Sequence, residues 1–282
     1  MPPLIRNISD TARWVAVFRA DESERPDAVF HDPFARKLAG ERGEQITDAI
    51  TFSRTNSWSF VARTYSFDEI IRLHVQEGFD MIINLAAGLD TRPYRMSLPA
   101  TLQWIEIDFP EMISYKRDML SRETPNCKLE SIQLDLSDQK ARIELFDKLN
   151  SRCTKALIVA EGLIGYLDAG EAAALADDLS TQQNFKHWVF DMMSPGLFAM
   201  VQKEMGSFLK DANAPLKFAP TEGEGFFLPH GWRSLESRSH LKVAAKLNRL
   251  SAEMLSYAAY PEPAGPKGDI PWAGVCLFEN IK

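Results

Sequence analysis

The chain has 282 residues, of which 45% are hydrophobic and 25% are charged, and its formal net charge is −7 at pH 7. This composition supplies ample core material, and the acidic balance repels a phosphate backbone, so we expect no nucleic-acid partner. The longest apolar stretch, around Met81 to Leu89, is far shorter than the ~20 residues that cross a bilayer, and the N-terminus lacks a signal-peptide pattern. We therefore expect a cytoplasmic protein with no membrane partner.

The first 78 residues show helical spacing and no strand-like alternation. Apolar and small side chains recur every three or four positions from Ile8 to Phe18 and again from Phe60 to Ile71. Between these segments, Arg19 to Asp27 forms a charged connector that we interpret as a solvated loop. Asp32 followed by Pro33 is typical of a helix start, with Asp32 as N-cap. Residues 1–78 are thus predicted to form a helical N-terminal cap.

Strand-like and helix-like segments then alternate for more than a hundred residues. The predicted strands are Met81 to Leu85, Leu102 to Ile107, Leu129 to Leu134, Ala156 to Ala160 and His187 to Phe190. The predicted helices between them are Glu111 to Arg122, Gln139 to Leu149 and Ala169 to Gln182. This alternation predicts an α/β fold with a doubly wound, mostly parallel sheet, which residues 79–193 would form as a cofactor-binding core.

The pattern loosens after residue 193. Residues 194–231 combine an amphipathic piece with turns rich in proline and glycine, which we interpret as a lid over a ligand cleft. Residues 232–282 then read as strand, helix and strand, at Trp232 to Arg238, Leu241 to Tyr257 and Trp272 to Phe278. That gives seven strands in all. No linker separates two cores, so we expect residues 1–282 to form a single domain.

Cysteine usage gives no sign of crosslinks or metal binding. Cys127, Cys153 and Cys276 lie far apart, and none belongs to a CxxC pair. Neither a disulfide framework nor a zinc site fits this spacing, so we expect three buried thiols and no metal.

The first half of a nucleotide-binding βαβ unit runs from Phe79 to Asp108. An apolar strand leads into the small-residue turn Ala86-Ala87-Gly88, and a second strand ends on Asp108, twenty residues beyond Gly88. The turn would let backbone N–H groups approach a ligand, and the carboxylate can accept both ribose hydroxyls. Because the GxGxxG glycines of dehydrogenases are missing, adenosine binding is favoured over pyrophosphate binding.

Four motifs in chain order carry a resemblance to a known family. They are NLAAGLDTRPYRM, EIDFPEMISYKRDML, LDLSD and EGLIGYLD, within a match over residues 28–195. Together they resemble the leucine carboxyl methyltransferase family, which includes polyketide O-methyltransferases that use S-adenosylmethionine. The resemblance implies a Rossmann-like class I methyltransferase fold and S-adenosyl-L-methionine as cofactor.

The resemblance implies a role for each acid and glycine at the strand ends. Asp108 falls on the ribose-binding acid, and Gly88 lies where the backbone approaches the methionine part of the cofactor. Where the family usually has Gly-x-Gly, this chain has Ala86 at the first position. Asp135 and Leu136 suit an adenine clamp, in which the carboxylate takes the exocyclic amine and a backbone N–H meets the ring N1.

Three further residues are assigned mainly through the resemblance. Arg63 falls on the arginine that holds the methionine carboxylate, and Arg92 is a second candidate that could equally pair with Asp90 or Asp108. Glu161 would bond the cofactor's amino group. Tyr166 would face the substrate as the candidate catalytic residue. The lone His230 in the lid is a weaker candidate.

The sequence thus predicts an S-adenosylmethionine-dependent O-methyltransferase with a small-molecule acceptor, polyketide-like by resemblance. A carboxylate acceptor is ionised at pH 7 and needs no base, whereas a phenol benefits from one. No base is evident in the motifs, which favours a carboxylate, or a phenol served by the lid. Two alternatives stay open: methylation of a protein's C-terminal leucine carboxylate, and a non-catalytic adenosine-ligand binding protein. Oligomeric state is not indicated.

Overall fold

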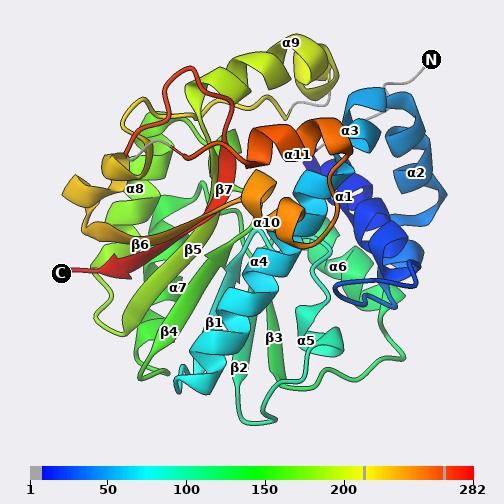
Figure 1. The fold of residues 1–282 in the computed structure, drawn as a ribbon. Coiled ribbons are helices and arrows are strands. Elements are labelled where there is room, and N and C mark those ends of the chain that lie inside the picture. Colours follow the sequence, from blue (N-terminus) through cyan, green and yellow to red (C-terminus); the bar gives the residue numbers. More distant parts are fainter. Residues whose placement is uncertain (1–7, 212–213, 263–264) are drawn as a thin grey trace.

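A computed structural model describes residues 8–211, 214–262 and 265–282 (Figure 1). Within these residues, seven strands form one sheet in the order β3-β2-β1-β4-β5-β7-β6. Their bounds are β1 (Met81–Leu85), β2 (Gln103–Asp108), β3 (Lys128–Gln133), β4 (Ala156–Ala160), β5 (Phe185–Met193), β6 (Trp232–Ser239) and β7 (Ala273–Asn280). All seven strands occur where the sequence predicts them, and the predicted doubly wound α/β fold is confirmed.

The strand order places a switch point between β1 and β4. Strands β1 to β5 pair in parallel, whereas β7 is antiparallel to both β5 and β6. From β1 the chain proceeds outward through β2 to β3, and then returns to the other side of β1 to form β4 and β5. The loops after β1 and β4 therefore diverge, and they leave a crevice at the carboxyl ends of the strands, where doubly wound sheets bind ligands.

Helices cover both faces of the sheet and one of its ends. Their bounds are α1 (Ile8–Ser23), α2 (Ala35–Ala49), α3 (Thr51–Thr55), α4 (Ser57–Gln76), α5 (Arg92–Arg95), α6 (Pro110–Met119), α7 (Gln139–Asn150), α8 (Ala169–Ser180), α9 (Pro195–Asp211), α10 (His240–Lys246) and α11 (Ala252–Ala258), with 3-10 turns η1 (Ile164–Tyr166) and η2 (Gly223–His230). In Figure 1 the dark-blue α1 and the yellow-green α9 lie beyond one end of the strands.

Side-chain alternation along β1 divides the core into two layers. Met81, Ile83 and Leu85 belong to a buried cluster that includes side chains of α7 and α8. Ile82, between them, belongs to the cluster on the other face, together with Phe67 of α4. Both faces of this strand are thus covered, which explains why its sequence is continuously apolar rather than alternating.

The predicted charged connector at Arg19 to Asp27 is wrong in its first half. Helix α1 continues to Ser23, and both Arg19 and Glu22 are buried. Glu22 pairs with Arg249 at 2.8 Å, and Arg19 pairs with Asp32 at 2.9 Å. These charges are buried because each has a partner from a distant part of the chain, which periodicity does not reveal.

Two helix predictions are also corrected. Helix α2 begins at Ala35, so its N-cap is Phe34 and not the predicted Asp32. The Asp32 carboxylate instead accepts hydrogen bonds from Arg19, Thr91 and the Phe34 N–H. The expected helix over Leu241 to Tyr257 is two helices, α10 and α11. Asn248 adopts a left-handed φ of 56° between them, and Ser251 caps α11 by accepting from Met254 N–H.

Candidate cofactor site

The carboxyl ends of β1 to β4 border a cavity of about 520 Å³. Helices α1, α4 and α8 contribute to its other walls, together with Ala214, Pro215 and Lys217. The cavity is lined by nine of the ten candidate residues from the sequence, namely Arg63, Ala86, Gly88, Arg92, Asp108, Asp135, Leu136, Glu161 and Tyr166. His230 is not among the lining residues and instead pairs with Asp177 at 3.1 Å.

The turn after β1 and the tip of β2 are joined by a hydrogen bond. Gly88 N–H donates to Asp108 Oδ2 at 2.6 Å, and Phe109 N–H donates to Asp108 Oδ1 at 2.7 Å. Burial raises the pKa of the Asp108 carboxyl, and these two N–H groups partly oppose that rise. Both Ala86 and Gly88 have a φ of 50°, a left-handed conformation that alanine adopts only with strain.

The loop after β3 presents Asp135 and Leu136 to the same cavity. Asp135 Oδ1 accepts from Ser137 N–H at 2.9 Å, and Asp138 caps α7 by accepting from Ala141 N–H at 3.0 Å. Leu136 N–H is not bonded to any residue that the structure describes. The loop therefore offers a carboxylate and an N–H group side by side at the edge of the cavity.

An arginine–carboxylate network lies at the opposite side of the crevice. Arg63 Nε bonds Glu161 at 3.1 Å, and Arg63 Nη1 bonds Asp191 at 3.2 Å. Glu161 also pairs with Arg92 at 2.8 Å, so this carboxylate lies between two guanidinium groups. Burial lowers the pKa of Arg63, but Asp191 and Glu161 outweigh that effect and raise it.

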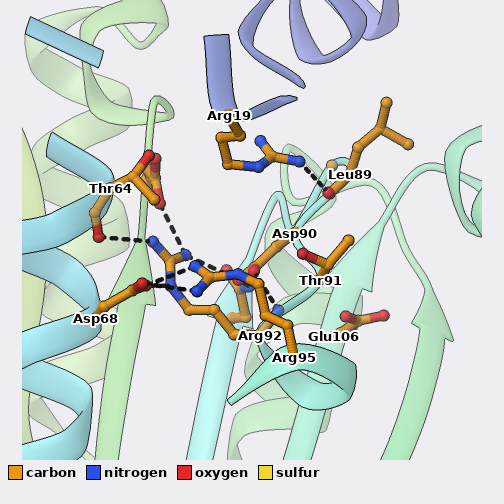
Figure 2. A network of polar contacts seen from close by, with 12 residues as sticks. Arg19, Thr64, Asp68, Leu89, Asp90, Thr91, Arg92, Arg95 and Glu106 are labelled. Atoms are coloured by element: carbon orange, nitrogen blue, oxygen red, sulfur yellow. Dashed lines mark hydrogen bonds and ion pairs between the residues drawn. The ribbon is translucent and has the colours of Figure 1, made fainter. Parts of the chain in front are cut away.

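Arg92 is a structural member of this network. Figure 2 shows it enclosed between Asp68 and Asp90, with a further bond to the Thr64 carbonyl. Only 2% of Arg92 is exposed. Of the two partners that the sequence left open, the structure pairs Arg92 with Asp90.

Helix α1 supplies a more apolar wall. Trp14 and Phe60 meet edge to face with ring centroids 5.3 Å apart, and Tyr166 packs against the same cluster. Burial raises the pKa of the Tyr166 phenol, and a hydrogen bond with Thr11 lowers it only in part. Tyr166 is therefore neutral at pH 7 and suited to hydrogen bonding rather than to proton abstraction.

Several residues that line the cavity were not predicted from the sequence. Arg19 reaches the turn after β1 and donates to the Leu89 carbonyl at 2.6 Å, as Figure 2 shows. Arg142 of α7 and Trp14 of α1 also line the cavity. Their positions depend on how helices pack on the sheet ends, and neither motif nor spacing in the sequence indicates that packing.

The described part of the chain contains no group of three or more histidine, cysteine or acidic side chains able to hold a metal ion. None of its helices combines the length and apolar character needed to span a bilayer. Cys127, Cys153 and Cys276 are all free and buried, as the sequence predicts.

Known proteins resemble this chain over most of its length. A protein from Frankia alni that carries the name of an S-adenosyl-L-methionine-dependent methyltransferase is 30% identical, over 85% of this chain and 88% of its own length. One of the same name from a Parafrankia strain is 32% identical, over 88% and 84% respectively. Among solved structures, a DUF574-family protein from Streptomyces avermitilis superposes with a TM-score of 0.61 and 14% identity, covering 96% of this chain and 97% of that one.

An O-methyltransferase family protein from Burkholderia thailandensis superposes with a TM-score of 0.50 and 14% identity, over 96% of this chain and 70% of that one. At such low identity these structures support the fold alone. The leucine carboxyl methyltransferase family model matches residues 12–180, which is more than half of the chain. The chain thus belongs to the leucine carboxyl methyltransferase family and is an S-adenosylmethionine-dependent methyltransferase.

Proposed function

We propose that this protein is an O-methyltransferase that methylates a carboxylate or hydroxyl oxygen of a small, largely apolar molecule of polyketide type. The observation that carries the proposal is the arrangement of the cavity. Asp108 and Asp135 lie at adjacent strand ends, Arg63 and Glu161 lie across the switch point, and an aromatic wall from α1 and α4 faces the space between them.

The donor groups of the cavity fit S-adenosylmethionine. Asp108 would accept from the ribose hydroxyls, and Asp135 with the unbonded Leu136 N–H would hold the adenine amine and ring nitrogen. Nε and Nη1 of Arg63 are taken by carboxylates, and Nη2 has no partner among the described residues. That nitrogen is the group we assign to the cofactor's carboxylate, with Glu161 beside it for the ammonium group.

When bound, the cofactor supplies an electrophilic methyl group on a sulfonium. The protein's own task is to orient an acceptor oxygen and to exclude water, and such positioning is worth on the order of 7–11 kcal/mol. Tyr166 and Thr11 would hold the acceptor oxygen by hydrogen bonds, and Trp14 and Phe60 would contact its apolar body. A neutral Tyr166 is a poor base, which favours an acceptor that is already ionised, such as a carboxylate.

A segment that lines one side of the cavity disfavours a protein C-terminus as acceptor. In the segment 214–217, Ala214, Pro215 and Lys217 line the cavity, and Lys217 N–H donates to the Gly165 carbonyl at 2.8 Å, which fixes this segment against η1. Gln202 Nε2 also donates to the Leu216 carbonyl at 2.8 Å. We infer that this segment acts as a lid that admits a compact molecule more readily than a peptide tail.

The test is transfer of a tritiated methyl group from the cofactor to panels of small carboxylic acids and phenols, and to a peptide ending in leucine. We expect labelled small molecules. Methyl esters release labelled methanol in mild alkali and methyl ethers do not, so one treatment separates the two acceptor types. Preferred labelling of the peptide would contradict the small-molecule acceptor, and cofactor binding without transfer to any acceptor or cell extract would indicate a binding protein.

A further inference from the structure

The carboxylate and N–H group at the end of β3 are held in place by a buried ion pair behind the loop. Arg142 of α7 is 6% exposed, and its Nη1 donates to the Leu136 carbonyl at 2.6 Å. Its Nε donates to Asp178 Oδ2 of α8 at 3.0 Å, and Nη2 bonds the same oxygen. One guanidinium therefore connects the loop to two helices that pack beneath it.

The bonds around this loop fix one particular peptide unit. The carbonyl of Leu136 is held by Arg142, and the N–H of the same peptide unit, on Ser137, is held by Asp135 Oδ1 at 2.9 Å. Asp138 N–H bonds the Asp135 carbonyl at 3.0 Å on the other side. Rotation of the peptide after Leu136 would break both bonds at once. The preceding N–H, on Leu136, is left without a partner among the described residues.

We propose that Arg142, supported by Asp178, is the positioning residue for adenine recognition: it fixes the loop so that Asp135 and the Leu136 N–H together select a 6-aminopurine. This inference rests on the proposed adenine site. An adenine offers a donor at its amine and an acceptor at N1, which match the carboxylate and the N–H group. A 6-oxopurine has the opposite pattern at both atoms, so a correctly held loop rejects it, and a loosened loop discriminates less.

The test measures binding of two ligands, S-adenosyl-L-homocysteine and S-inosyl-L-homocysteine, by calorimetry to the wild-type protein and to Arg142→Met, Arg142→Lys and Asp178→Asn. We expect Arg142→Met to bind the adenosyl ligand about tenfold more weakly, which is about 1.4 kcal/mol at 25 °C. Binding of the inosyl ligand, which is already weak in the wild type, should weaken much less. The ratio of the adenosyl affinity to the inosyl affinity should therefore fall. Asp178→Asn should weaken binding of the adenosyl ligand by about threefold. Methyl transfer at saturating cofactor should keep kcat within about twofold while KM for the cofactor rises.

The matched control is Arg152→Met. Arg152 also bonds a carboxylate, Glu130 at 2.6 Å, but it lies beyond the other end of α7 and outside the cavity. It should leave both affinities unchanged. If circular dichroism shows that Arg142→Met does not fold, Arg142→Lys and Asp178→Asn replace it in the test. Both preserve side-chain volume, and Arg142→Lys also preserves the charge.

Three results would overturn the inference: unchanged affinities in the folded variants, equal losses for the adenosyl and inosyl ligands, or a fall in kcat with the cofactor's KM unaffected. The second would mean that the ion pair only stabilises the fold. If the wild-type protein itself binds neither ligand, the proposed function fails rather than this assignment.

Discussion

Gly88 and Asp108 lie twenty residues apart in the chain and are joined by a 2.6 Å hydrogen bond from the Gly88 N–H to the Asp108 carboxylate. The bond ties the turn after β1 to the tip of β2. Because β1 and β2 are parallel neighbours in the sheet, their carboxyl ends meet at one edge, and a small-residue turn can come within hydrogen-bonding distance of the acid. The relationship defines the floor of the cavity on which the proposed chemistry depends.

Replacing Ala86, in the same turn, with glycine should stabilise the protein. Its φ of 50° places an L-residue in the left-handed region, at a cost of about 1 kcal/mol that glycine does not incur. We expect Ala86→Gly to raise the free energy of unfolding by about that amount, with cofactor affinity equal or higher. Thermal unfolding checks the first and calorimetry the second.

The matched control is Ala87→Gly. Ala87 does not have a positive φ and is buried, so glycine there gains no strain relief and loses a packed methyl group. It should lower stability. A loss of stability in Ala86→Gly comparable to that in Ala87→Gly would contradict the strain argument.

Arg63 should contribute to affinity only through the amino-acid part of the cofactor. We expect Arg63→Met to weaken binding of S-adenosyl-L-homocysteine by about tenfold, the usual cost of a lost charge-assisted hydrogen bond. Binding of 5′-methylthioadenosine, which lacks the carboxylate and the ammonium group, should stay unchanged. Calorimetry with both ligands decides this, and an equal loss for the two would remove Arg63 from the proposed role.

The buried pair of Arg19 and Asp32 should hold α1 against the cofactor turn. Burial raises the pKa of Asp32, but Arg19 and Arg95 outweigh it and lower that pKa, so the carboxylate is ionised at pH 7. Asp32→Asn would leave the Arg19 guanidinium buried without its counterion, and we expect a loss of about 3 kcal/mol in the free energy of unfolding. Urea titration measures it.

Arg36→Ala is the surface comparison for that pair. Arg36 forms ion pairs with Asp21, Glu24 and Glu44, but 40% of its side chain is exposed. Exposed pairs contribute roughly 0–1 kcal/mol, so this variant should be nearly as stable as wild type. If Asp32→Asn caused as little loss of stability as Arg36→Ala, the pair would not be what holds α1 against the turn after β1.

The histidine pair at the amino ends of the strands should make the fold sensitive to acid. His74 Nδ1 lies 2.7 Å from the Ile70 carbonyl and must donate to it, so in neutral His74 the bare Nε2 accepts from His187 Nδ1, also at 2.7 Å. Burial lowers the pKa of both rings, that of His187 from 6.5 to about 4, with His74 as its second cause.

The sign of the pH effect follows from these lowered values. Each ring binds its proton more readily in the unfolded chain, so its contribution to stability is intact above pH 6.5 and is lost as the pH falls toward 4. Glu77, Lys155, Arg238 and Glu279 are the charged groups that act on the pair. We expect the free energy of unfolding to decline between pH 6.5 and 4, and less steeply in His187→Gln. Parallel profiles for the two proteins would contradict this origin.

The positions of the strands along the chain, and the acids near their ends, could be predicted because the local sequence indicates both. A continuous apolar run of about five residues indicates a strand buried on both faces. The residue after such a run lies at the carboxyl end of that strand. Glu161 directly follows such a run in β4. Asp108 and Asp135 lie at the ends of β2 and β3, whose sequences contain polar residues, and the family motifs helped to place them. The family resemblance added Arg63, whose position on a helix before the first strand carries no local sign of its partners.

The charges that lie behind the site could not be predicted in the same way. Arg19 and Arg142 occupy helix positions that resemble solvated faces, and their partners come from other segments, Asp32 thirteen residues away and Asp178 thirty-six residues away. A pattern of hydrophobic spacing cannot tell a buried ion pair from two surface charges. The break between α10 and α11 was missed for a related reason, since the left-handed Asn248 leaves the apolar spacing of the segment intact.

The most direct test of the shared cofactor site is calorimetric titration of S-adenosyl-L-homocysteine into the wild-type protein and into Asp108→Ala, with Glu111→Ala as a control on the exposed start of α6. We predict micromolar binding to the wild type and to the control, and about hundredfold weaker binding to Asp108→Ala, because two charge-assisted hydrogen bonds are lost. Equal affinity of Asp108→Ala and wild type would contradict the account.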